Sequence, residues 1–179
     1  MEKYIALLRG INVGGKNKIS MPELKMAFEE NGFADVKTYI NSGNVIFSGD
    51  IDSEIKLKKA CENLIMAEFQ LSIPVAIISA KDLSAALRNA PDWWGTDGET
   101  KHNAIFVLYP STPETVIEQV GEFKPEYEQI DYYGQVIFWS APIKTFSKTR
   151  WLRIVGTAVY DNVTIRNANT TKKLLQLTQ

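Results

Sequence analysis

Apolar residues form short runs and helical stripes along the first half of the chain, and their order predicts a mixed fold. The continuous apolar run Tyr4–Leu8 is typical of a buried strand. Further strands are predicted over residues 36–40, 44–47 and 73–78, and helices over 20–31 and 52–69. The resulting order, strand–helix–strand–strand–helix–strand, is the ferredoxin-like arrangement (βαββαβ). We therefore expect an α+β fold with an antiparallel sheet packed by helices.

Local signals define the ends of these two helices. Ser20 is a predicted N-cap with Glu23 completing a capping box, and Asn31-Gly32 is a typical helix end. The second helix, 52–69, is expected to turn four apolar side chains inward: Ile55, Leu57, Leu64 and Ile65.

The second half of the chain predicts the same order again. The expected elements are a strand at 103–108, a helix at 112–120, a hairpin of 127–131 with 135–139, a helix at 147–159, a strand at 163–166 and a helix at 169–177. Residues 134–138 (GQVIF) repeat residues 43–47 (GNVIF) with one change, in the same place in each half. A duplication is one explanation, and chance similarity of two apolar strands is the other.

This pattern divides the chain into three segments. Residues 1–79 form one expected ferredoxin-like unit, 80–102 a linker, and 103–179 a second unit with a C-terminal helix. The linker holds the adjacent pair Trp93-Trp94 among glycines and acidic residues. The pair is either a stacking platform or lid for a ligand, or an apolar plug at the joint between the units.

Composition limits the chemistry that these units can carry. The chain has 179 residues, of which 45% are hydrophobic and 23% charged, as in soluble globular proteins. The single cysteine, Cys61, excludes a disulfide framework and is expected to be a buried, inert thiol. The single histidine, His102, removes most zinc, haem and Ser-His-Asp chemistry and is expected at the surface or at a sheet edge. No metal and no cofactor are predicted.

Charge is distributed unevenly along the chain. The net charge is −1 over residues 1–79, −6 over 80–142 and +6 over 143–179. Such asymmetry indicates either a basic face that meets an anion or mutual neutralisation within the fold. No segment is apolar enough to span a membrane and the N-terminus lacks signal-peptide features, so we expect a cytoplasmic protein.

Three blocks of the sequence resemble one bacterial family. They are residues 6–15 (ALLRGINVGG), residues 38–47 (TYINSGNVIF), and residues 166–170 (RNANT) with Lys173-Leu174. Together they are similar to the family DUF1697, a domain of unknown function, over nearly the whole chain. The resemblance implies two ferredoxin-like repeats and no particular activity. Members often carry tryptophan at the position of Ala168, so an aromatic role there is not expected in this chain.

The glycine-rich stretch after the first strand is the most distinctive motif. Its Gly10-x-x-x-x-Gly15-Lys16 spacing is that of a P-loop, but Asn17 replaces the hydroxyl residue that binds magnesium, and the helix begins only near Ser20. A P-loop NTPase is therefore not predicted. Glycine amides can still form an anion-binding nest, with Arg9 and Lys16 supplying charge. The alternative is a tight turn with solvated basic side chains.

Three other segments carry polar groups that suit an anion. Arg166-Asn167 precedes a predicted helix start at Asn169-Thr170, and helix N-termini attract anions. Asn41, in the predicted hairpin turn, is either ordinary turn chemistry or an amide beside the glycine-rich loop. A basic group interleaved with aromatics, comprising Lys144, Lys148, Arg150 and Arg153, is either a nucleic-acid contact or a solvated helix face with Trp151 in the core.

These observations favour a protein that binds a phosphate-bearing ligand, either a nucleotide or nucleic acid. The isoelectric point of 5.9 favours a small ligand over a nucleic-acid polymer. The predicted ligand-binding residues are Arg9, Asn12, Gly14, Gly15, Lys16, Asn41, Arg166, Asn167 and Asn169. No catalytic residue is assigned.

Two other function classes stay open. A small hydrolase of phosphate esters or acyl phosphates is suggested by analogy with acylphosphatases, which pair an arginine after the first strand with an asparagine nearby. A protein-interaction module would use sheet edges or the tryptophan pair.

Overall fold

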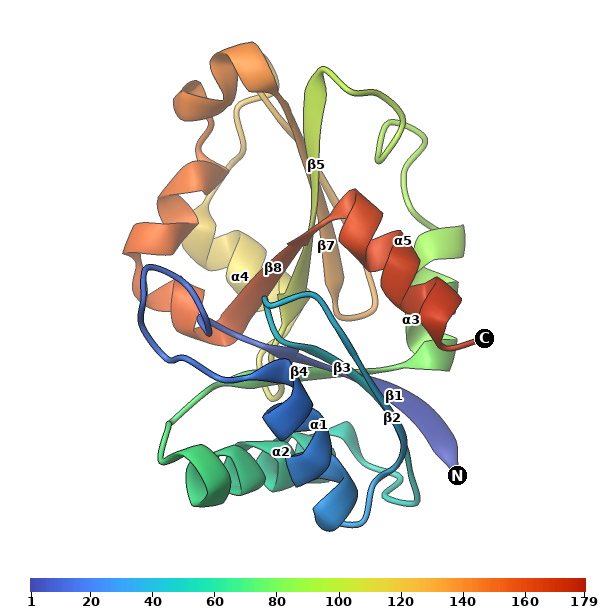
Figure 1. Ribbon diagram of the computed structural model, residues 1–179. Helices are drawn as coiled ribbons and strands as arrows, with labels where there is room; N and C mark the ends of the chain where they lie inside the picture. The colour runs from blue at the N-terminus through green and yellow to red at the C-terminus, as the bar shows by residue number, and fades with distance from the viewer. The chain divides into compact units, whose positions relative to one another are not determined.

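The computed structural model describes residues 1–179, which form a mixed α+β protein with two four-stranded antiparallel sheets packed by helices (Figure 1). The chain divides into two compact units. The first comprises Met1–Leu83 with Leu174–Gln179, and the second comprises Ser84–Lys173. Residues 80–102, expected as a linker, include the helix α3 (Ala80–Arg88) and the start of strand β5 (Thr100–Val107).

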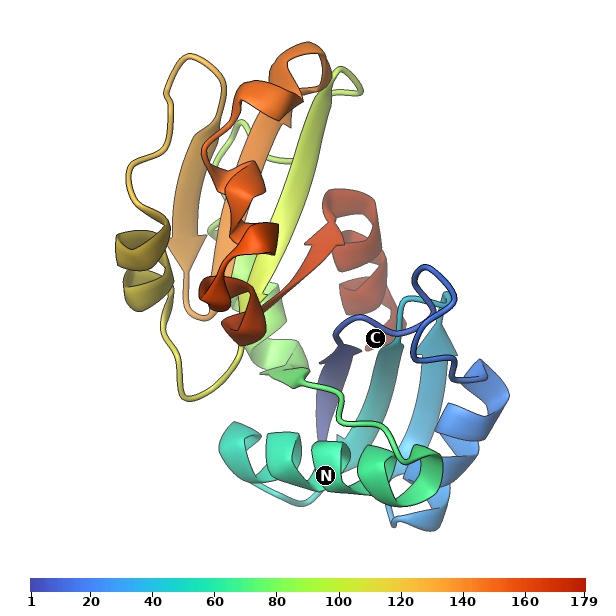
Figure 2. The same ribbon diagram turned by 90° about the vertical axis from the view of Figure 1, so that its left-hand side faces the viewer.

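The first unit has the element order that the sequence predicts. Its elements are β1 (Glu2–Leu8), α1 (Met21–Glu30), β2 (Ala34–Tyr39), β3 (Asn44–Gly49), α2 (Glu54–Phe69) and β4 (Val75–Ser79). The strand order in the sheet is β2-β3-β1-β4, and all neighbours are antiparallel. Figure 2 shows α1 and α2 together on one face of this sheet.

Side-chain caps fix the ends of the two helices. The Ser20 hydroxyl accepts a hydrogen bond from the Glu23 amide at 3.4 Å, as predicted, and Asn31 ends α1 before Gly32 with φ +89°. The expected inward position of Ile55 is wrong, because this residue is 56% exposed. It lies in the first turn of α2, on the side opposite the buried stripe of Leu57, Cys61, Leu64 and Ile65.

The core of the first unit lies between the sheet and these helices. Alternate β1 residues Tyr4, Ala6 and Leu8 face it, as the two-residue period of a strand requires. Phe28 of α1 and Phe33 meet Phe47 of β3 with ring centroids 5.5 and 4.8 Å apart.

The second unit repeats the strand order but not every helix. Its elements are β5, α4 (Pro113–Val120), β6 (Gln129–Tyr133), β7 (Val136–Pro142), β8 (Val163–Asn167) and α5 (Ala168–Leu177). The sheet runs β6-β7-β5-β8, again antiparallel throughout. In Figure 2, α4 lies on one side of this sheet and the start of α5 on the opposite side.

The prediction of one continuous helix over 147–159 is wrong. The chain forms three short 3₁₀ helices instead: η1 (Ile143–Lys148), η2 (Trp151–Gly156) and η3 (Ala158–Asn162). Extended backbone at Thr149 (ψ 149°) and Thr157 (ψ 164°) interrupts a continuous helix. The buried carboxylate of Glu128 accepts the amides of Arg150 and Trp151, which fixes the start of η2.

Strand registers in the two sheets correspond position by position. In the first sheet, β1 pairs with β3 through Tyr4↔Phe47, Ile5↔Ile46 and Ala6↔Val45. In the second sheet, β5 pairs with β7 through Ala104↔Phe138, Ile105↔Ile137 and Phe106↔Val136. The repeated Val-Ile-Phe segment therefore occupies equivalent rungs in both units.

Candidate functional site

The glycine-rich loop joins β1 to α1 and turns back on itself. Gly14 and Gly15 have φ values of +58° and +74°, and the Lys16 amide donates to the Val13 carbonyl at 3.0 Å. Positive φ at both central residues is the requirement of a type I′ turn, which glycine meets without strain. Turn geometry thus accounts for both glycines, and the predicted anion nest stays a prediction. Gly14, Gly15 and Lys16 are exposed at the tip.

Asn12 holds this loop against the β2–β3 hairpin. Its side-chain amide donates to the carbonyls of Ile19 and Asn41, both at 2.9 Å, and its Oδ1 accepts the Ile19 amide at 2.9 Å. Both amide hydrogens are therefore used within the protein, which makes Asn12 a structural clamp. The Arg9 backbone amide donates to the Pro74 carbonyl at 3.0 Å and ties the start of the loop to the residue before β4.

The hairpin turn beside the loop is tightly packed. The buried Asn44 side chain donates to the Tyr39 carbonyl at 2.9 Å and to the Ser42 hydroxyl at 3.0 Å. Gly43 has φ +86°, and a Cβ there would lie 2.7 Å from Ile11 Cδ1. Asn41 is exposed beside this turn, with its carbonyl bound to Asn12.

In the second unit, the predicted residues around position 167 take different roles. The Arg166 side chain is buried on β8 and donates from Nη1 to the Thr164 hydroxyl at 2.8 Å and to the Ile165 carbonyl at 3.0 Å. Burial lowers the pKa of this guanidinium to about 10.

The start of α5 differs from the expected one at Asn169-Thr170. Asn167 is the capping residue, because its Oδ1 accepts the Thr170 amide at 2.8 Å, and the helix begins at Ala168. Asn169 is exposed in the first turn.

A cavity of about 380 Å³ lies at this helix start. One wall comprises seven residues between Gly95 and Asn103, and the other is Asn167–Asn169. Its volume lies in the usual range for small-molecule sites, roughly 300–1,000 Å³. The structure therefore brings the predicted residues Asn167 and Asn169 together with His102 and Asp97, which sequence reasoning did not assign to a site.

His102 is buried in a central strand, so the expectation of a surface or edge residue is wrong. It is 8% exposed and lies on β5 between β7 and β8. Its Nδ1 lies 2.6 Å from the Ser140 hydroxyl, whereas its buried Nε2 has no hydrogen-bond partner. The carboxylate oxygen Oδ2 of Asp97 lies 3.6 Å from Nε2. A hydrogen bond from the Thr100 hydroxyl lowers the pKa of Asp97.

The alternation of side chains along strand β5 indicates that His102 is buried. The strand starts at Thr100 rather than 103, which places His102 on the same face as Ala104 and Phe106. If the predicted strand had begun at Thr100, alternation would have predicted that His102 is buried. It would not have predicted the positions of Ser140 and Asp97.

Trp94 forms part of the surroundings of this cavity and is not available as a stacking platform. It is buried, packs edge-on against Phe138 at 5.0 Å, and donates from Nε1 to the Asn103 carbonyl at 2.8 Å. Lys172 of α5 donates to the Gly95 carbonyl at 3.0 Å and lies 5.6 Å from the Trp94 ring. These contacts hold the 95–103 segment against the helix.

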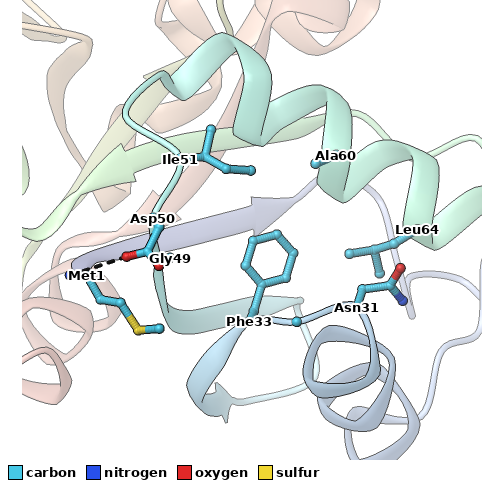
Figure 3. Close-up of a pocket in the computed structure, with 9 residues that line it drawn as sticks. Met1, Asn31, Phe33, Gly49, Asp50, Ile51, Ala60 and Leu64 are labelled. Atoms are coloured by element: carbon cyan, nitrogen blue, oxygen red, sulfur yellow. Dashed lines mark ion pairs between the residues drawn. The ribbon is translucent and has the colours of Figure 1, made fainter.

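A second cavity, of about 280 Å³, lies in the first unit (Figure 3). Phe33, Ile51 and Leu64 line it, and at one side the Met1 amino group is 3.4 Å from the Asp50 carboxylate. The amide of Asn31 already donates to the Ala27 carbonyl. With a mainly apolar lining, this cavity offers less specific chemistry than the one at α5.

Other candidate groups are structural. Trp151 is buried in the second core, as one interpretation of the basic segment predicted, and Arg150 Nε donates to the Val120 carbonyl. Cys61 is buried, and this burial raises the pKa of its thiol. No cluster of three or more His, Cys, Asp or Glu side chains is placed to hold a metal ion. None of the helices has the length and apolar surface needed to cross a bilayer.

Comparison with known proteins places this two-sheet α+β chain in a family. The chain belongs to the family described as "Protein of unknown function (DUF1697)", whose model matches residues 1–138. It is similar to the conserved bacterial protein SP0830 from Streptococcus pneumoniae, with 33% sequence identity and a TM-score of 0.87 over 99% of both chains. No curated protein matches the chain.

Proposed function

We propose that this protein binds a small phosphate-bearing ligand in the cavity at the start of α5. The observation that carries the proposal is the meeting of three features in one cavity: a helix N-terminus, the Asn167 and Asn169 side chains, and the unpartnered Nε2 of His102. Each can donate a hydrogen bond, and the ionised oxygens of a phosphate accept such bonds.

The helix start supplies donors that its own cap does not use. An α-helix leaves its first four amides without intrahelical partners, and Asn167 satisfies the one on Thr170. The remaining amides, together with the partial positive charge of the helix end, favour an anion. Asp97 adds one acceptor, which suits a ligand that also carries a hydroxyl or amino group, as a nucleotide does.

The glycine-rich loop of the first unit is a separate proposed anion contact. Gly14, Gly15 and Lys16 are exposed at its tip, with Asn41 exposed in the hairpin turn nearby. We retain Arg9 and Lys16 as proposed charge donors of this loop, and Arg166 on β8 as a proposed charge donor of the second unit. A small ligand is favoured over nucleic acid because the chain carries 20 basic and 21 acidic residues.

We also propose that the two units are duplicated ferredoxin-like repeats of a cytoplasmic protein. The shared strand order and the matching registers of β1–β3 and β5–β7 support the duplication. The second repeat would have replaced its second helix by η1, η2 and η3.

Thermal unfolding with a ligand panel tests the binding proposal. The panel comprises inorganic phosphate, nucleotides, sugar phosphates and short single-stranded RNA and DNA. A ligand at 100 times its dissociation constant stabilises the folded state by about 2.7 kcal/mol. For a chain of this size that raises Tm by roughly 5–10 °C.

Two matched substitutions locate the site. Asn169→Asp places a carboxylate in the first turn of α5, where it stabilises the free helix but repels a bound phosphate. Asn41→Asp makes the same change at an exposed asparagine beside the glycine-rich loop. We expect Asn169→Asp to weaken binding roughly 10-fold while leaving Tm of the free protein equal or slightly higher. Loss of binding only in Asn41→Asp would move the site to the loop, and no shift with any ligand would favour a protein-interaction module.

A further inference from the structure

His102 lines the cavity at the start of α5, and its buried Nε2 has no hydrogen-bond partner. The other two buried nitrogens without a partner, in the indoles of Trp139 and Trp151, belong to the hydrophobic core of the second unit. We infer that the Nε2–H of His102 recognises an anionic oxygen of the ligand, and that Ser140 positions the imidazole for this role. The inference rests on the proposed function and names the residue that selects the ligand.

Ser140 decides which nitrogen carries the proton. Ser140 is 2% exposed, and its hydroxyl is hydrogen-bonded to His102 Nδ1 at 2.6 Å. A buried hydroxyl that accepted from Nδ1–H would leave its own hydrogen without an acceptor, which costs free energy. The hydroxyl therefore donates to Nδ1, and in the neutral ring the hydrogen resides on Nε2. That hydrogen belongs to the nitrogen without a partner.

Asp97 is close to Nε2 without satisfying it. Its Oδ2 lies 3.6 Å away, beyond hydrogen-bonding distance, and its side chain is half exposed. The other carboxylate oxygen, Oδ1, already accepts the Glu99 amide at 3.0 Å. A ligand oxygen in the cavity would give the buried Nε2–H a full hydrogen bond that the free protein lacks. Relief of an unsatisfied buried donor makes this contact more valuable than an exposed one.

The other groups around the ring support recognition rather than nucleophilic catalysis. Ser140 is buried and is not among the residues that line the cavity, so its hydroxyl cannot attack a ligand. The charged side chains around the cavity include Asp97 and Lys101, which line it, Arg166 on β8 and Lys172 on α5. The cations keep the surroundings compatible with an anion despite Asp97.

The test measures the imidazole first and binding second. Because His102 is the only histidine, its ring nitrogens give unambiguous ¹⁵N NMR signals without assignment by mutation. We expect the tautomer with hydrogen on Nε2 in the free protein. Addition of inorganic phosphate or AMP should shift the Nε2 signal more than the Nδ1 signal.

Binding is then compared among three variants. His102→Met removes the donor at similar length, His102→Gln keeps an N–H near the position of Nε2, and Ser140→Ala leaves the ring in place without its positioning hydroxyl. We expect phosphate or AMP affinity to fall about 10- to 100-fold in His102→Met, to recover in part in His102→Gln, and to fall less in Ser140→Ala. Each variant is first checked for an unchanged fold by circular dichroism.

The outcomes separate this inference from the proposed function. Wild-type binding that persists unchanged in a folded His102→Met variant, or a tautomer with hydrogen on Nδ1, overturns the role of His102 and leaves phosphate binding intact. If wild type binds no member of the panel, the proposed function is wrong and the inference falls with it.

Discussion

Replacing Gly43 by alanine is expected to destabilise the first unit through two separate costs. The residue has φ +86°, and an L-residue held in the left-handed region loses about 1–2 kcal/mol. The new Cβ would also lie 2.7 Å from Ile11 Cδ1 and 2.8 Å from Leu8 Cβ, inside van der Waals contact. Overpacking of this kind costs typically about 1–3 kcal/mol. The two terms together predict a loss of about 2–5 kcal/mol.

Gly14→Ala is the matched control for this experiment. Its φ is +58° but nothing lies within 4 Å of the added Cβ, so only the backbone cost of about 1–2 kcal/mol applies. Urea unfolding followed by far-ultraviolet circular dichroism measures both variants against wild type. Equal destabilisation by the two substitutions would refute the claim that Gly43 is packed against Leu8 and Ile11.

Three further predictions concern groups that the structure buries. Cys61 should react with a thiol reagent only after denaturant is added, because the side chain is buried and its thiol pKa is raised; rapid native labelling would contradict this. Glu128→Gln should lower the free energy of unfolding by about 1–3 kcal/mol relative to exposed Glu126→Gln, because an amide cannot accept both N–H groups that the carboxylate accepts. Burial raises the pKa of Tyr4 to about 12 from 10, so its contribution to stability is present below pH 10 and is lost as pH rises toward 12. Tyr4→Phe should remove this part of the alkaline pH dependence, and an unchanged profile would exclude it.

Much of the fold follows from periodicity and capping signals. The apolar run of β1, the Ser20 cap and the Asn31-Gly32 helix end each give local information that tertiary contacts reinforce. The segment 147–159 has the composition of an amphipathic helix but depends on Glu128, a residue distant in sequence, for its start. Local propensity carries no information about such a contact, which explains the error in helix type.

The candidate site was predictable in part for the same reason. Asn167 and Asn169 could be proposed as site residues because a helix start has a local signature, although the cap is Asn167 rather than the expected Asn169-Thr170. His102 was missed because its partner Ser140 lies on another strand, and only the register His102↔Ser140 brings the two together. The glycine-rich loop differs from His102, because its motif is conspicuous in the sequence. Its glycines are explained by the turn geometry, and Asn12 is explained by its hydrogen bonds within the protein.

A ¹H–¹⁵N NMR titration of backbone amides with inorganic phosphate and AMP tests the proposed cavity site, because it reports the position of the bound anion residue by residue. We expect saturable shifts that are largest at Ala168 and Asn169, which line the cavity at the start of α5, with His102 affected in step. Shifts confined to Gly14, Gly15 and Lys16, or no saturable shift at any amide, would contradict a phosphate-binding site in the cavity of the second unit.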